Sequence, residues 1–222
     1  MMNERFSGLT KLPKQPAARL LSNANAELET ELAAPASASV EVVLEELEAK
    51  GALIDMLRLL SVALPARERV WWSCLAARDT LAEGGKLPPP LAAAEAWVFK
   101  PTEENRAVAH HSLQHASMKD DTKHCAMAVQ WHDGTLGPGD LAQHPAPPGG
   151  SEVSAFAMNV VAIGKSGKTL EIAAALLIDR ALDIARGGSG QGKPAPKARA
   201  ETTKAETAKA ETTKAQTTKE GA

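Results

Sequence analysis

The chain has 222 residues, enough for one sizeable domain or two small ones, and a formal net charge of −2. A charge so close to zero argues against a general nucleic-acid binder, which normally carries a basic surplus. Residues 1–186 hold 18 basic and 23 acidic side chains (−5), whereas residues 187–222 hold 7 and 4 (+3). Only 3% of the residues are aromatic and alanine dominates the apolar ones, which favours helices over strands. The composition therefore predicts an acidic helical body with a mildly basic tail.

The two cysteines, Cys74 and Cys125, lie far apart in the sequence and predict reduced thiols rather than a disulfide framework. Cys74 falls on an apolar helical stripe, where a buried and inert thiol is expected. The N-terminal sequence lacks the apolar region and cleavage site of a secretory signal. No apolar segment reaches the roughly 18 residues that span a bilayer. We therefore expect a cytoplasmic protein that does not insert into membranes.

Proline and low-complexity sequence mark the two ends of the chain. Residues 1–36 contain three prolines and no sustained apolar period, which predicts a mostly disordered arm with at most local helix over 17–32. Residues 37–188 hold the amphipathic segments and form the predicted helical domain. Residues 189–222 include AETTK repeats, whose period of five matches no helical face. We predict that this tail is disordered, with transient helix from its Glu–Lys pairs.

Apolar residues recur at helical spacing in consecutive segments of the predicted domain. Ser39 is placed to cap the first helix, Pro65 to begin the third, and Thr102 to cap the helix that follows a pair of proline stops. The expected helices cover about 39–51, 53–64, 65–84, 88–99, 102–117, 121–132, 151–164 and 169–187, with a Gly/Pro-rich loop over 134–150. Short connections between amphipathic helices favour antiparallel neighbours. The sequence thus predicts an all-α, compact and short solenoid-like array of antiparallel helical hairpins.

Residues 162–169, AIGKSGKT, fit the loose Walker A pattern with alanine in place of the first glycine. In a phosphate-binding loop, backbone N–H groups cradle the phosphates, Lys168 would reach the terminal phosphates and Thr169 would hold magnesium. However, the preceding segment has helical spacing, and Asp179, the nearest candidate for the magnesium-binding aspartate, lies inside the following helix. We therefore predict a polar turn between two antiparallel helices. Nucleotide binding through Gly167, Lys168 and Thr169 is the alternative hypothesis.

Six histidines raise the question of a metal site. His111 and His115 are four residues apart, so both can meet one metal ion from a single helix face. Each is expected to point about 160° away from the apolar Leu113, toward solvent. No acidic partner of the HExxH kind is present. We therefore expect a solvated histidine pair, no metal and no cofactor.

The four tryptophans cannot all share one core face. Trp71 belongs to an apolar stripe, whereas Trp72 points about 100° away from it, toward a neighbouring helix or a partner. The core is the conservative interpretation for these residues. As candidates for an interaction surface we name Trp72, Trp97 and Trp131, together with the loop over 134–150.

Four segments carry a resemblance to a known family: RERVWWSCLAAR, LAAAEAWVFKPTEENR, AMAVQWHDGTLGPGDLAQHPAPP and ALDIARGG. They resemble an uncharacterised bacterial, all-helical family of unknown function over about Ala52 to Gly188. The resemblance implies a helical fold, a variable turn at the position of AIGKSGKT, and an association with gene neighbourhoods of type VI secretion systems. It implies no activity and no site residue.

Three functional hypotheses follow. The first is a non-catalytic accessory or adaptor protein that acts through contacts with other proteins and is associated with a secretion system. The second is a nucleotide-binding protein that uses the Walker-A-like turn. The third is a tether, in which the basic tail contacts an acidic or nucleic-acid partner; a charge of +3 makes this attraction weak and sensitive to salt.

Overall fold

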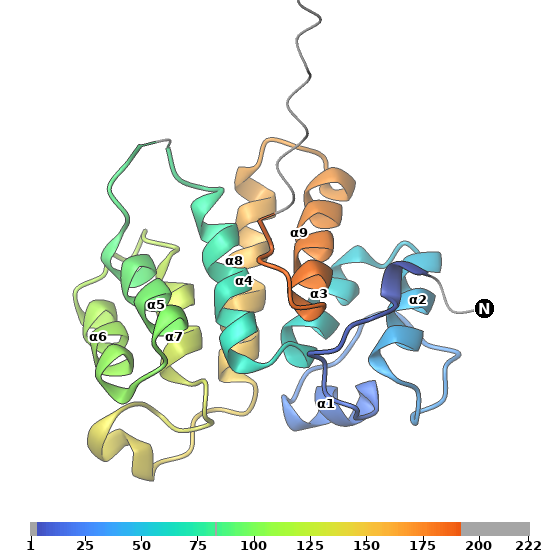
Figure 1. Cartoon of the computed structure of the whole chain (residues 1–222), viewed down its shortest axis with the longest axis horizontal. Helices are drawn as coiled ribbons and strands as arrows, with labels where there is room; N and C mark the ends of the chain where they lie inside the picture. The colour runs from blue at the N-terminus through green and yellow to red at the C-terminus, as the bar shows by residue number, and fades with distance from the viewer. Residues whose placement is uncertain (1–3, 83, 192–222) are drawn as a thin grey trace, which may run out of the picture. The chain divides into compact units, whose positions relative to one another are not determined.

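The computed structural model describes residues 4–82 and 84–191. Over these residues it contains nine α-helices, two 3-10 helices and no strand, which confirms the all-α prediction (Figure 1). In chain order the elements are η1 (Glu4–Phe6), α1 (Ala17–Asn23), α2 (Val40–Ala49), α3 (Leu53–Ala63), α4 (Ala66–Arg78), α5 (Pro89–Phe99), α6 (Glu103–Gln114), α7 (Lys123–Gln130), η2 (Gly139–Gln143), α8 (Gly150–Lys165) and α9 (Leu170–Ala185).

Two groups of helices meet at α4 and α8 (Figure 1). On one side α5, α6 and α7 pack on one another, and on the other side α1, α2 and α9 pack against α3. Helix α4 contacts α5 and α7 of the first group and α9 of the second, while α8 contacts α7, α4 and α3. Consecutive helices therefore pair as hairpins, and contacts between distant parts of the sequence close them into a compact array.

Helix α4 has neighbours on several sides, and eight of its 13 residues are buried. Trp72 is completely buried, and its indole Nε1 donates a hydrogen bond of 2.9 Å to the carbonyl of Leu177 in α9. The prediction that Trp72 belongs to an interaction surface is therefore wrong. A side chain that points away from one apolar stripe of α4 meets another helix, because this helix is covered on more than one face. Cys74 is also completely buried, as predicted.

Two of the predicted helix caps are confirmed. The Ser39 hydroxyl accepts a hydrogen bond of 3.5 Å from the N–H of Val42, and the Thr102 hydroxyl accepts one of 3.4 Å from the N–H of Asn105. Each bond satisfies an N–H group that has no partner inside its own helix. The start of α6, which forms part of the site described below, is thus set by local sequence.

Ser151, which the sequence placed as the cap of α8, lies inside the first turn of that helix. The N-cap is Gly149, with a φ of +72°. The buried Ser151 hydroxyl donates to the carbonyl of Ala128 at 2.8 Å and accepts from the guanidinium of Arg69 at 3.2 Å. Arg69, itself 6% exposed, also pairs with Glu152 at 2.8 Å. The hydroxyl therefore joins α8 to α7 and α4 instead of ending a helix.

Residues 4–36 pack against the other helices, in contrast to the mostly disordered arm that the sequence predicted, and α1 lies within the stretch 17–32 where local helix was expected. Phe6 and Leu12 are 0% and 7% exposed, and both belong to the core. The N–H of Lys11 donates a hydrogen bond of 2.9 Å to the carbonyl of Ala185 at the end of α9. Phe6, Leu9 and Leu12 lie before α1, where the segment forms only the short η1 and irregular backbone, so no amphipathic helix or strand marks their burial in the sequence.

The packed body also extends beyond the predicted limit at residue 188. The indole Nε1 of Trp71 donates a hydrogen bond of 2.7 Å to the carbonyl of Ser189. Gly190 is buried as well. The rest of the predicted tail, residues 192–222, lies outside the described residues, and its disorder stays a prediction.

Glu46 of α2 holds the irregular segment that precedes this helix. Its carboxylate pairs with Lys50 at 2.7 Å and accepts hydrogen bonds from the N–H groups of Ala33 (2.6 Å) and Ala34 (2.8 Å). The bond from Lys50 and these two N–H groups lower the pKa of Glu46 from 4.5 to about 2. Because the folded-state pKa lies below the unfolded value, the stabilisation is present above the unfolded pKa and is lost as the pH falls toward the folded one.

We expect the Glu46→Gln variant to lose less stability than the wild type when the pH falls from about 5 to about 2.5, because its side chain does not titrate. Urea unfolding at a series of pH values measures this difference. Glu45→Gln, on the same helix, serves as the control and is expected to follow the wild type. Parallel pH profiles for the wild type and Glu46→Gln would contradict the prediction.

Candidate functional site

The three tryptophans named from the sequence do not form a common surface. Trp72 and Trp97 are 0% and 3% exposed, and Trp131 is half-buried. The ring of Trp97 packs against His132, with 4.6 Å between the ring centroids. Trp131 lies so close to Gly150 that a Cβ on this glycine would be 2.9 Å from the indole ring. These side chains hold α5, the end of α7 and the start of α8 together.

The Walker-A-like turn connects two helices, as the sequence predicted. Helix α8 continues to Lys165, whereas a phosphate-binding loop follows a strand. At the start of α9, the Glu171 carboxylate accepts bonds from its own backbone N–H and from the Thr169 hydroxyl, and these lower the pKa of Glu171. A carboxylate thus already lies at the helix N-terminus, where a phosphate would bind. Gly167, with a φ of +66°, and the exposed Lys168 complete a surface turn.

The histidine pair on α6 lies in solvent, as predicted. The rings of His111 and His115 are exposed and meet edge to face, with centroids 4.6 Å apart. Within the described part of the chain, neither ring has a hydrogen-bond partner. In residues 4–82 and 84–191 no three His, Cys, Asp or Glu side chains gather in a group that could hold a metal ion.

A largely apolar hollow of about 580 Å³ lies between α5 and α6, and we call it the α5–α6 groove. Helix α5 lines it with small side chains, and α6 contributes one face of its surface. Its lining includes Pro89, Ala92, Ala96, Val108, His111 and His115, together with one acidic residue, Asp120. Val108 is 51% exposed although it is apolar.

The solvent face of α5 carries only apolar side chains. A surface helix normally presents polar residues to water. The one charged residue of α5, Glu95, instead points inward: it is 6% exposed and accepts a hydrogen bond of 2.6 Å from Arg78 of α4. The face that remains in solvent consists of Pro89, Ala92, Ala96 and Phe99. Phe99 is 72% exposed, so this apolar surface extends past the groove to the end of the helix.

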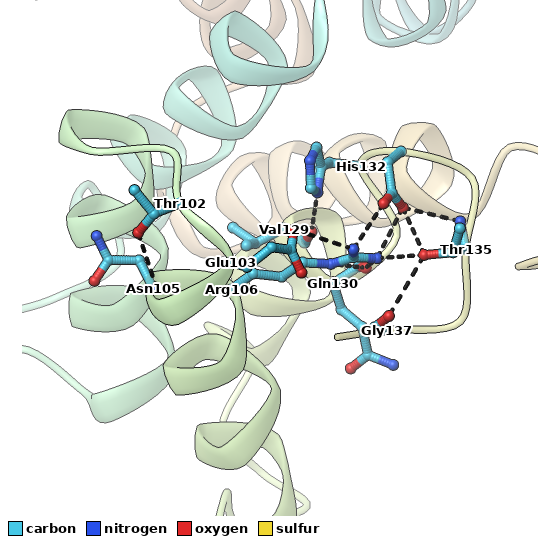
Figure 2. Close-up of polar contacts among 10 residues, drawn as sticks. Thr102, Glu103, Asn105, Arg106, Val129, Gln130, His132, Thr135 and Gly137 are labelled. Carbon is cyan, nitrogen blue, oxygen red and sulfur yellow. Dashed lines mark hydrogen bonds and ion pairs between the residues drawn. The ribbon is translucent and has the colours of Figure 1, made fainter. Parts of the chain in front are cut away.

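Arg106 fixes the opposite, inner face of α6 (Figure 2). Its side chain is only 1% exposed and donates to both carboxylate oxygens of Asp133, at 2.7 and 2.8 Å. It also donates to the Gln130 carbonyl at 2.6 and 3.0 Å and to the Thr135 hydroxyl at 2.7 Å. One side chain therefore joins the first turn of α6 to the end of α7 and to the residues that follow it.

The carboxyl of Asp133 is adapted to this partner. Partial burial would raise the pKa of Asp133, but the hydrogen bonds from Thr135 and the positive charge of Arg106 outweigh that effect. The net result is a lowered pKa, so that the ionised form is favoured. The pair is therefore an ion pair joined by two parallel N–H···O bonds, the geometry in which arginine binds carboxylates most strongly.

His110 makes a second link between α6 and α7. The Gln130 amide nitrogen donates to the carbonyl of Leu136 at 2.7 Å, so the amide oxygen is the acceptor that faces His110 Nδ1 at 3.1 Å. His110 Nδ1 therefore carries a proton, and its Nε2 is left to accept from Gln114 at 3.3 Å. Together with Arg106, this network holds the wall of the groove that α6 provides.

The loop over 134–150 is ordered by the same network. Thr135, held by Arg106, forms an antiparallel bridge with Pro145, and the N–H of Leu136 donates to the carbonyl of His144 at 2.9 Å. The loop contains η2 and returns close to its own start. Compact loops whose ends meet in this way are often functional, and this one remains a candidate contact surface.

The α5–α6 groove was not predicted from the sequence, although the sequence contains a signal for it. The segment PPLAAAEAWVF is apolar on every side of a helix, and such a helix must be covered all round. The helices next to α5 in the sequence cannot cover all of its faces. An apolar face of α5 exposed to solvent could therefore have been predicted. Arg106 had no comparable signal, because the partners that make its short bonds, Gln130, Asp133 and Thr135, lie more than 20 residues away in the sequence.

Fold and groove together define a helical domain with a largely apolar groove between α5 and α6. The chain belongs to a family of unknown function (DUF6931), which matches residues 43–185. The match confirms the resemblance to a family of unknown function, and it contains both walls of the groove as well as Arg106 and Asp133. No curated protein and no solved structure matches the chain. Of the helices in the described residues, none has the length and hydropathy to cross a membrane.

Proposed function

We propose that the chain is a non-catalytic accessory protein that binds an amphipathic helix of another protein in the α5–α6 groove. The observation that carries this proposal is the solvent face of α5, which exposes only apolar side chains beside a hollow of about 580 Å³. Apolar patches with a polar surround commonly mark sites of protein contact. In helix-in-groove recognition, apolar side chains at positions i, i+3, i+4 and i+7 enter such a groove.

The size of the lining residues supports a helix as the occupant. Ala92 and Ala96 lie on adjacent turns of α5, and their short side chains allow another backbone to approach closely. Helix α5 has 11 residues and is therefore about 16 Å long, which matches three turns of a bound helix. Val108 stands opposite, on the wall that Arg106 and His110 hold in place.

The source of the bound helix and the cellular location of the chain are also proposals. We propose that the bound helix belongs to a secretion-system component, since the resemblance brings an association with type VI secretion gene neighbourhoods. The free and buried thiols of Cys74 and Cys125 suit a reducing compartment, which supports the cytoplasm as the location. The accessory role requires no metal, no cofactor and no catalytic residue.

Nucleotide binding is the competing proposal. A hollow of about 310 Å³ beside the Walker-A-like turn is lined by Lys168, Ser166 and Asp79, among others. Titration of a fluorescent ATP analogue against the wild type and Lys168→Ala tests this proposal. We expect no binding that depends on Lys168, because α8 replaces the strand of a phosphate-binding loop and the Glu171 carboxylate already lies at the N-terminus of α9. Micromolar binding that is lost in the variant would support nucleotide binding instead.

Selection from a displayed library of random peptides of about 14 residues tests the groove, since this length forms nearly four helical turns. With the wild-type chain as bait, we expect enriched peptides to carry apolar residues at i, i+3, i+4 and i+7. The Val108→Asp variant places a charge at the centre of the groove and is expected to reduce their affinity by at least about ten-fold.

Val42→Asp is the matched control for this experiment. Val42 is 41% exposed on α2, so the same substitution is made at a similar apolar surface position outside the groove. It is expected to bind the selected peptides like the wild type. Failure to enrich a helical apolar pattern, or equal binding to Val108→Asp and the wild type, would refute the groove as a helix-binding site.

A further inference from the structure

Helix α9 exposes two large aliphatic side chains on one face. Ile172 and Leu176 are 58% and 44% exposed and lie one turn apart. Asp179, whose side chain is 63% exposed, follows on the same face. A helix face that lies in water is normally polar throughout. We call these three residues, together with Lys168 in the turn that precedes α9, the α9 stripe.

Lys168 supplies a positive charge at the beginning of the α9 stripe. It is exposed and, together with Leu176, lines a hollow of about 310 Å³. The side chain of Lys168 therefore lies on the side of α9 that carries the apolar pair. Among the residues that the structure describes, its ammonium group has no ion pair or hydrogen bond.

The carboxylates near Lys168 are engaged elsewhere. Asp79 lines the same hollow, but it pairs with Arg180 at 2.7 Å. The Glu171 carboxylate accepts bonds at the N-terminus of its own helix, where the helix dipole stabilises it. Glu171 also points about 100° away from Ile172. The Lys168 ammonium is therefore the charge that the beginning of the stripe offers to another molecule.

The other end of the α9 stripe is acidic. Oδ1 of Asp179 accepts a hydrogen bond of 2.6 Å from Arg5, and Arg5 also pairs with Glu48, so that two carboxylates share one guanidinium. Asp183, one turn after Asp179, adds a carboxylate that accepts from a backbone N–H. The guanidinium of Arg186 donates to backbone carbonyls of the N-terminal segment. The carboxylates named here outnumber the guanidinium groups by one.

A second copy of the stripe in antiparallel orientation complements this pattern. Ala174 lies midway between Ile172 and Leu176, with Lys168 six residues before it and Asp179 five residues after it. With a two-fold axis at the level of Ala174, Ile172 of each copy faces Leu176 of the other. Lys168 of one copy and Asp179 of the other then lie at the same height, each about 8 Å along the helix from the axis. A parallel pair would instead place like charges together.

We infer that two copies of the chain associate through the α9 stripe as an antiparallel, two-fold symmetric pair, in which Lys168 of each copy binds Asp179 of the other. The symmetry repeats each contact. The α5–α6 groove lies on other helices, so the inference is independent of the proposed function. Helix α9 has 16 residues and is about 24 Å long. A contact limited to one such helix is smaller than the about 800 Å² per partner of a standard interface, so we expect a weak dimer.

Light scattering of the full chain at increasing concentration tests the inference. We expect the apparent mass to rise from 23.3 kDa toward twice that value over about a hundred-fold range of concentration. Leu176→Asp buries a charge in the apolar contact and is expected to weaken association at least about ten-fold. Leu170→Asp is the matched control, since Leu170 is also 44% exposed on α9 but points about 160° away from Ile172. It is expected to associate like the wild type.

Exchanged charges test how the two copies are arranged. Lys168→Glu and Asp179→Lys are each expected to associate about five-fold more weakly than the wild type, because each places like charges opposite one another. An equimolar mixture of the two variants is expected to recover association, since both contacts of a mixed pair again join opposite charges. Circular dichroism checks that each variant is folded.

Three results would overturn the inference. A wild type that keeps the mass of one chain throughout leaves the α9 stripe to a different partner. Association of Leu176→Asp at the wild-type strength, or its loss in Leu170→Asp, places the contact between copies elsewhere. A mixture that associates no better than the single variants excludes the pairing of Lys168 with Asp179.

Discussion

Replacing Trp72 by alanine is expected to lower the free energy of unfolding by about 4 kcal/mol, the upper range for loss of a buried large aromatic side chain. The indole is completely buried in the middle of α4. Its removal leaves a cavity where α4 meets its neighbours and also deletes the 2.9 Å hydrogen bond to the Leu177 carbonyl. Since α4 and α8 join the two groups of helices, the loss of packing around Trp72 destabilises both groups.

The adjacent tryptophan is a matched control for this prediction. Trp71 is half-buried at the surface, where its ring lies 5.9 Å from that of Phe99. Its replacement by alanine is expected to cost about 1.5 kcal/mol, since this side chain is only partly buried. Urea unfolding followed by circular dichroism measures both variants. Similar losses for Trp71→Ala and Trp72→Ala would show that Trp72 is not the buried centre of α4.

Replacing Arg106 by leucine is expected to lower the free energy of unfolding by about 3 kcal/mol. The substitution leaves the Gln130 carbonyl and the Thr135 hydroxyl without their donor and leaves Asp133 without its partner. The Asp133 side chain is 36% exposed, so water can hydrate part of the freed carboxylate and the effect stays at the lower end for a buried pair.

Three measurements distinguish this role of Arg106 from simple loss of packing. Arg106→Lys keeps the charge but not the planar fork, and is expected to recover less than half of the stability. In Arg106→Leu the pKa of Asp133 is expected to rise, because a positive neighbour that lowers it is gone. Arg19→Leu, at an exposed position of α1, is expected to change stability by less than about 0.5 kcal/mol. An unchanged pKa of Asp133 would contradict the ion pair.

The same variant tests whether the bonds that Arg106 makes to Gln130, Asp133 and Thr135, which we call the Arg106 clamp, keep the α5–α6 groove in shape. Arg106 holds the first turn of α6, and Val108 lies two residues further on. If α6 moves when the clamp is removed, the selected peptides should bind more weakly to a chain that remains folded. Peptide binding to Arg106→Leu at a temperature well below its unfolding transition measures this effect.

Local sequence patterns predicted the helices well because each carries its own signals. The caps at Ser39 and Thr102 act within one turn, and the apolar stripe of α2 packs mainly against α3 and η1. The same patterns failed for α4, since Trp72 faces α9 and the other apolar residues face other helices. An apolar stripe identifies one buried face of a helix. A helix in the middle of an array is buried on several faces, and a single stripe does not identify them all.

The groove and its clamp could not be predicted in the same way. The exposure of Ala92, Ala96 and Phe99 depends on which neighbours α5 acquires, and this is decided by packing over the whole chain. Arg106 reads as an ordinary surface arginine of an amphipathic helix. Only the fold shows that the end of α7 and the loop after it turn toward its guanidinium.

Gly149 links the family domain to the segment that precedes it. A Cβ at this position would lie 1.9 Å from the carbonyl oxygen of Ala24, and the backbone is left-handed there, with a φ of +72°. Gly149 belongs to the matched stretch 43–185, whereas Ala24 does not. A family member whose N-terminal segment packs against this position as Ala24 does can therefore carry only glycine there. A member whose N-terminal segment packs elsewhere can also carry asparagine, which tolerates the left-handed conformation. A residue other than glycine at this position therefore indicates that the first residues of that relative do not pack here as they do in this chain.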